Sequence, residues 1–242
     1  MRKVSVDEKC DIIQLIITRT GESIMSEEKK DQKLNKFSVP LGLLDYINPI
    51  MYTITAYQIY KHMEAAMGQP WHLVFTIGAA LSLIFGFVIP TGKVIVGLGI
   101  IKFVMPVSLV FLVNSGIFIS GLVLAKTVFA MSVPFIAAIF AVSVVFLIFV
   151  YSKSKKINTI AVLTGAVGYM LIYVSLITLS IRAGLTLPII LFAAAICLFV
   201  MLCGIGIKAN LYDPKIHWVI EASNVICQSC VALGTVLLFK GM

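Results

Sequence analysis

Long apolar runs, each about the length of a membrane span, follow one another along the chain after residue 40. A helix needs about 20 mostly apolar residues to cross the hydrocarbon core of a bilayer. Seven runs have this length, and the first is the least apolar: 41–60, 71–90, 103–125, 129–151, 158–181, 187–207 and 216–239. The pattern predicts an all-α integral membrane protein with seven transmembrane helices.

The first 40 residues differ from the rest of the chain because they are polar and rich in charge. They hold eight of the nineteen Lys and Arg residues. Acidic residues interrupt any apolar core in this region, so no cleavable signal peptide is predicted. The segment that begins at Met25, MSEEKKDQKLNK, resembles the start of a natural protein. Whether residues 1–24 belong to the natural protein is therefore left open. We expect a basic cytoplasmic tail over 1–40 and a transmembrane domain over 41–242.

Composition and the placement of charge support a membrane protein. Of the residues, 60% are apolar and 12% charged, whereas soluble domains are about 25% charged. The net charge of +8 does not indicate nucleic-acid binding, because most lysines outside the tail lie at the ends of apolar runs. Cytoplasmic segments carry the excess of Lys and Arg. With the N-terminus inside, fifteen lie inside and four outside, so we expect a plasma (inner) membrane protein whose C-terminus is outside.

Two parts of the apolar region resemble each other in the same order. The segments 52–61, 70–86 and 114–126 align with 173–182, 188–204 and 228–240. The matches predict two parallel three-helix repeats, about 41–126 and 158–240, joined by an inverting linker helix over 129–151. Parallel repeats of this kind occur in transporters. Chance similarity between apolar helices is the alternative.

Polar residues form a stripe on the last predicted helix. At about 100° per residue, His217, Glu221, Asn224 and Gln228 fall within about 60° of arc. Such a stripe must face protein or water, because unpaired polar groups are costly in hydrocarbon. An acid inside the membrane is also costly and usually marks a pathway or a proton relay. We therefore expect Glu221 to bind a cation or a proton.

The first and third predicted helices carry further polar side chains. Asp45, Asn48, Tyr52 and Thr55 lie within about 80° of arc on the first helix. We expect a polar cavity that binds the substrate, lined by Asp45, Asn48, Tyr52, Asn114, Ser115, His217, Glu221, Asn224 and Gln228. The alternative is that these groups only hydrogen-bond one another between helices.

The sequence allows two roles for His217 and two for Lys102. His217 is either an anchor at the membrane interface, beside Trp218, or part of a proton relay. Lys102 either pairs with Glu221 or extends to the interface with its charge in water.

Other motifs are weak. The segment GFVIPTGKV, residues 86–94, departs from the phosphate-binding loop in spacing and lacks its Ser or Thr. We expect Pro90, Thr91 and Gly92 to form a turn that ends the second helix. Cys227 and Cys230 form a C-x-x-C in mid-span, where thiols usually pack as small apolar groups. No catalytic set, metal cluster or nucleotide fingerprint is apparent, so we predict neither an enzyme nor a cofactor.

Three helices, a linker and three more resemble the SWEET sugar transporters and the Pnu-type vitamin transporters, which share that fold. The segment NPIMYTITAYQIYK, residues 48–61, is similar to the first SWEET helix. Asn114 and Asn224 resemble the asparagine pair that contacts sugar in that family, so the resemblance implies a solute site there. Pro49 lacks the family's partner proline in the fifth helix, the expected orientation is opposite to that of SWEETs, and the tryptophan-rich Pnu signature is missing.

Together these features predict a transporter or facilitator that moves a small polar solute through a central cavity. Its expected partners are the lipid bilayer and a small polar solute or cation, and self-association into a homo-oligomer is left open. One alternative is a membrane sensor or scaffold that binds a partner through its polar helix face. The other is an intramembrane enzyme that uses Cys227 and Cys230.

Overall fold

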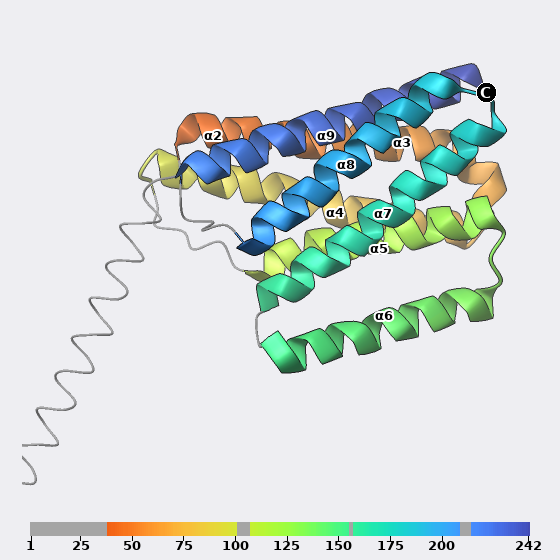
Figure 1. Ribbon diagram of the computed structural model, residues 1–242, viewed down its shortest axis with the longest axis horizontal. Coiled ribbons are helices and arrows are strands. Elements are labelled where there is room, and N and C mark those ends of the chain that lie inside the picture. Colours follow the sequence, from red (N-terminus) through yellow and green to blue (C-terminus); the bar gives the residue numbers. More distant parts are fainter. Residues whose placement is uncertain (1–37, 101–106, 155–156, 209–213) are drawn as a thin grey trace, which may run out of the picture.

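The computed structural model describes residues 38–100, 107–154, 157–208 and 214–242, and it is helical almost throughout these ranges. Figure 1 shows long helices lying alongside one another in a bundle. The helices are α2 (Val39–Asp45), α3 (Ile47–Met67), α4 (Trp71–Gly97), α5 (Val107–Phe129), α6 (Val133–Ser154), α7 (Ile157–Arg182), α8 (Thr186–Lys208) and α9 (Pro214–Gly241). No strand occurs in the described ranges, which confirms the all-α prediction.

Several of these helices are long and apolar enough to cross a membrane. Within the described residues they are α4, α5, α7, α8 and α9. The apolar part of α6, Val133–Phe149, is shorter. Large apolar side chains are exposed on the outer helices, as on α6, where Val142 and Val145 are 68% and 66% exposed. A soluble monomer rarely exposes such contiguous apolar surface, so a lipid environment fits these helices.

The first predicted span, 41–60, is longer than expected and is interrupted. It runs from Val39 to Met67 as α2 and α3, with Tyr46 between them. Pro49, in the first turn of α3, has no N–H to donate to the carbonyl four residues earlier, that of Asp45. The helix therefore breaks next to Asp45.

The prediction that Pro90, Thr91 and Gly92 end the second helix is wrong. The helix α4 continues through Pro90 to Gly97. A proline inside a helix removes one hydrogen bond, and membrane helices tolerate this loss where neighbouring groups compensate. Pro90 leaves the carbonyl of Gly86 without its helical donor, and Thr91 donates its hydroxyl to the neighbouring carbonyl of Phe87 at 2.7 Å. The extra length brings Lys93 into the protein interior, where it is 8% exposed.

Six helices form a closed series of neighbours. Contacts join α3 to α4, α4 to α5, α5 to α7, α7 to α8, α8 to α9, and α9 back to α3. One hydrophobic cluster takes side chains from all six, and Phe75, Tyr173 and Phe192 are fully buried in it. Figure 1 shows α6 at the edge of the bundle. It packs on α5 and α7 through a small cluster of Phe118, Leu122 and Ile136.

Glycines bring α5 and α7 into close contact. A Cβ atom on Gly168 would lie 2.6 Å from the backbone nitrogen of Phe118, and one on Gly121 would lie 2.5 Å from the carbonyl oxygen of Gly168. In membranes, small residues commonly allow helix backbones to approach in this way. The α5–α7 contact is thus made largely of backbone.

We predict that Gly168→Ala lowers the melting temperature of the purified protein in detergent. The added methyl group meets backbone atoms of α5 that cannot move independently, and overpacking of this kind costs about 1–3 kcal/mol. The matched control is Gly204→Ala on α8, where nothing lies within 4 Å of the added Cβ. Equal melting temperatures for the two variants would contradict the close packing of α5 on α7.

Candidate functional site

A lysine lies between two carboxylates in the interior of the bundle. The Nζ of Lys93 on α4 donates to Oδ2 of Asp45 on α2 and to Oε1 of Glu221 on α9, each at 2.7 Å. The side chains of Lys93, Asp45 and Glu221 are 8%, 11% and 9% exposed. Three helices therefore meet at one buried group of charges.

Asn48 completes this group, which we call the charge cluster (Asp45, Asn48, Lys93 and Glu221). Its Nδ2 donates to Oδ1 of Asp45 at 3.0 Å and to Oε2 of Glu221 at 3.4 Å. Each carboxylate thus accepts one hydrogen bond from Lys93 and another from Asn48. The Oδ1 of Asn48 is buried and has no hydrogen-bond partner among the described residues.

Local sequence places each member of the charge cluster. Asp45 and Asn48 are three residues apart, so they project from one side of the interrupted α2–α3 segment. Gly42 allows α2 to lie against the end of α4, since a Cβ there would be 2.8 Å from Cγ2 of Val94. The hydroxyl of Tyr46 is also 2.6 Å from that of Thr91. These contacts fix Asp45 beside Lys93.

The charges in the cluster do not balance. Two carboxylates share one ammonium group, so the cluster carries one excess negative charge when both acids are ionised. Removing charges from water costs several kcal/mol per ion even in relaxed proteins. The arrangement therefore favours the uptake of one further positive charge.

The cluster lies near one end of the bundle. The helices α4, α6 and α8 end there, and α5, α7 and α9 begin there, at the left in Figure 1. His217 is one turn before Glu221 on α9 and is half-buried, and Trp218 is exposed. Under the predicted orientation this is the cytoplasmic end.

Other predicted site residues lie further along the bundle. Tyr52 is buried beside the hydroxyls of Ser82 and Ser120, from α4 and α5. Gln228 is buried beside the hydroxyls of Tyr169 and Tyr173 on α7. These side chains come from α3, α4, α5, α7 and α9. We call them the interior polar layer (Tyr52, Ser82, Ser120, Tyr169, Tyr173 and Gln228).

The remaining predicted residues are less enclosed. Asn114 donates its amide to the carbonyl of Ala161 at 2.9 Å, and Gly165 leaves the space that it occupies. In this arrangement Asn114 links α5 to α7. Ser115 and Asn224 are half-buried on α5 and α9.

Lys93 is the functional candidate that sequence reasoning missed. The turn predicted at Pro90, Thr91 and Gly92 would end the helix before Lys93 and place this lysine in a loop. The apolar residues that continue to position 101 indicate that the helix extends further. Lys102, considered as a partner for Glu221, lies outside the described residues, and the ammonium group on Glu221 is that of Lys93.

The cysteines of the C-x-x-C motif are free thiols. Cys227 is fully buried, and its Sγ donates to the carbonyl of Ala195 at 3.3 Å, with the hydroxyl of Tyr173 at 3.7 Å. Cys230 is half-buried. Cys227 thus packs between α7, α8 and α9. Within the described part of the chain, no three His, Cys, Asp or Glu side chains come together as metal ligands would.

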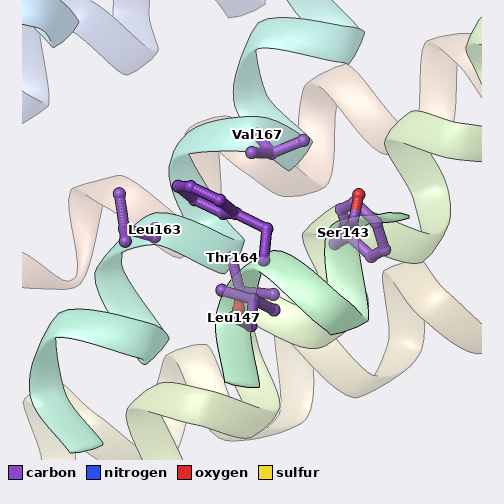
Figure 2. Close-up of a pocket in the computed structure, with 7 residues that line it drawn as sticks. Ser143, Leu147, Leu163, Thr164 and Val167 are labelled. Carbon is purple, nitrogen blue, oxygen red and sulfur yellow. The ribbon is translucent and has the colours of Figure 1, made fainter. Parts of the chain in front are cut away.

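Figure 2 shows a pocket on the other side of the bundle, between α5, α6 and α7. Its volume is about 40 Å³, and its lining is mostly apolar, with the hydroxyls of Ser143 and Thr164. None of the predicted site residues lines it. It is therefore distinct from the polar cavity that the sequence predicts.

No protein-family model, curated protein or solved structure matches this chain. Function therefore has to be inferred from the charge cluster and from the helices around it.

We predict that Lys93→Gln strongly destabilises the protein. It leaves two buried carboxylates without their ammonium group, and breaking a buried ion pair on one side costs about 3–5 kcal/mol. The measurement is the melting temperature in detergent, with Lys61→Gln as the matched control because Lys61 is exposed on α3.

The double variant Lys93→Gln/Glu221→Gln separates charge from packing. Removing the acid together with the lysine leaves fewer unpaired charges, so the double variant should melt above Lys93→Gln alone. If instead the two losses simply add, the 2.7 Å contact between Lys93 and Glu221 is not maintained in solution.

Proposed function

We propose that this chain is a membrane transporter or facilitator for a small polar solute, with its pathway enclosed by α3, α4, α5, α7, α8 and α9. The single observation that carries the proposal is the buried charge cluster, whose Lys93 and Glu221 lie on α4 and α9, two helices that are long and apolar enough to span a bilayer. Charged side chains within membrane helices are costly and rare, and they usually mark substrate or ion pathways.

The position of the cluster between the two predicted repeats supports this proposal. Asp45 and Lys93 belong to the first repeat, and Glu221 belongs to the second. The Lys93–Asp45 contact lies within one half, whereas the Lys93–Glu221 contact joins the two halves. A rocking movement of the halves, as in alternating access, would break only the second contact.

The order of neighbouring helices supports the three-plus-one-plus-three arrangement. The helix α4 contacts both α3 and α5, as α8 contacts both α7 and α9. The two halves meet at α5–α7 and at α3–α9. Two three-helix units related by a two-fold axis along the bundle would produce these pairs, with α6 outside as the linker. The layout is that of the SWEET and Pnu-type resemblance.

The interior polar layer is our proposed place for the solute. Tyr52 and Gln228, with Tyr169 and Tyr173 beside Gln228, offer hydroxyl and amide groups that can donate and accept hydrogen bonds. Glu221, nearer the start of α9, would then set the cation preference or the proton coupling. We place the N-terminus in the cytoplasm and the C-terminus outside.

The sensor or scaffold alternative requires the polar face of α9 to be open to a partner helix. Glu221 and Gln228 are 6% and 3% exposed and are covered by other helices of the same chain. The burial of this face favours an internal pathway.

The proposal predicts a ligand whose binding depends on Glu221. Wild type, Glu221→Gln and Glu64→Gln are compared in a thermal-shift screen in detergent, against sugars, amino acids, vitamins, nucleosides and monovalent ions. A ligand that binds the folded state raises the melting temperature. One class of solute should stabilise wild type and the Glu64→Gln control, whose carboxylate is 61% exposed, but not Glu221→Gln.

The solute found in this way is then measured for uptake into proteoliposomes. Uptake should fall at least tenfold in Glu221→Gln and stay near the wild-type rate in Glu64→Gln. Binding and uptake that are equal in all three proteins would overturn the role of Glu221. A well-folded protein that no solute stabilises would favour the sensor or scaffold instead.

A further inference from the structure

The charge cluster has one acceptor atom and one negative charge that are not matched. The Nδ2 of Asn48 serves both carboxylates, whereas its Oδ1 is buried without a hydrogen-bond partner among the described residues. An unsatisfied buried polar atom is uncommon in folded proteins. Asp45 and Glu221 together also carry one charge more than Lys93 can neutralise. Both observations indicate that a positively charged donor belongs in the cluster.

The described side chains around Glu221 do not supply this charge. The charged groups that act on it are Lys93, from α4, and Asp45, from α2. From α3 it meets the neutral amide of Asn48. The helix α8 ends at Lys208, whose side chain lies outside the described part of the structure. On α9 itself, His217 and Lys215 lie one turn and more towards the helix start. Among the described side chains, therefore, only Lys93 brings a positive charge to Glu221.

A proton fits the cluster better than a metal cation. A hard cation needs several oxygen ligands directed at one point. Here all four carboxylate oxygens already accept N–H donors, and the Lys93 ammonium and the Asn48 amide occupy the space between the acids. A proton needs only one lone pair on one oxygen. Its O–H then requires an acceptor, and the Oδ1 of Asn48 is the unused one.

We propose that Asp45 and Glu221 share one exchangeable proton, and that this proton is the coupling ion of the transporter proposed above. The step is a simple protonation: a proton from water binds a carboxylate oxygen, and the cluster becomes neutral with Lys93 still charged. The amide of Asn48 can rotate to accept from the new O–H, since its oxygen and nitrogen have nearly the same shape. The coupling part of this proposal rests on the proposed function, but the proton site does not.

The proton also explains how the two halves could separate. If Glu221 is ionised when it moves away from Lys93, its carboxylate is left buried and unpaired, which is strongly unfavourable. When Glu221 holds the proton, it can leave Lys93 without exposing a charge to the bundle interior. Lys93 then remains with Asp45 inside the first half. Proton binding thus permits the movement that the inter-half contact otherwise prevents.

Infrared spectroscopy of the full chain in liposomes tests the proton site without any solute. Wild type at neutral pH should show the absorption of a protonated carboxyl group, which shifts in D₂O and disappears at alkaline pH. The band should be lost in Glu221→Gln or in Asp45→Asn, because the pair shares one proton, and kept in the exposed control Glu64→Gln. Asn48→Ala should shift the band to higher frequency, because the O–H loses its acceptor.

The outcomes separate the two proposals. No protonated carboxyl in wild type at neutral pH overturns the proton site, and this measurement needs no variant to fold. A band that persists in both Glu221→Gln and Asp45→Asn also overturns it. Solute uptake with no carboxyl band leaves transport standing without this proton. A carboxyl band in a protein that binds no solute leaves the proton site standing and removes the proposed transport.

Discussion

The ammonium group of Lys93 between two carboxylates is the contact on which the arrangement of α2, α4 and α9 depends. Each N–O distance is 2.7 Å, and all three side chains are removed from water. In such surroundings the attraction is much stronger than at a surface, but so is the cost of desolvation. A buried ion pair is therefore weak evidence for stability. Its presence in a bundle that could be held by apolar packing favours a role in function.

Two prolines place this contact, although neither takes part in it. Pro49 breaks the first span beside Asp45, and Pro90 lies one turn before Lys93 on an unbroken α4. A missing N–H has different results at the two sites because the surroundings differ. At Pro90 the helix continues, and Thr91 donates to the Phe87 carbonyl beside the proline, whereas at Pro49 the chain changes from α2 to α3. The polar groups of the cluster thus lie close to positions where the regular hydrogen-bond series is interrupted.

The sequence predicts the helices and two of the acids well, but not the centre of the cluster. Apolar runs give the helix order and most boundaries to within a few residues, because length and hydropathy are local properties. The arc positions of Glu221 and Gln228 predict an interior face, and both are buried. The apolar residues after Lys93 indicate a longer helix, but its buried position does not follow from them, because it depends on Asp45 and Glu221 from other helices. The partner of Asn114 is likewise a backbone carbonyl of another helix.

The two contacts between the proposed halves differ in kind, and this difference bears on how the bundle could move. At α5–α7, glycines 121 and 168 bring backbone against backbone, and the Asn114 amide adds a hydrogen bond. Such an interface is dense and has little freedom to slide. At α3–α9, one end carries the charge cluster, and the other carries the stacked rings of His62 and Phe239 at 4.8 Å. Side chains that can separate hold this second interface. A rocking movement would therefore pivot at α5–α7 and open at α3–α9, where Glu221 lies.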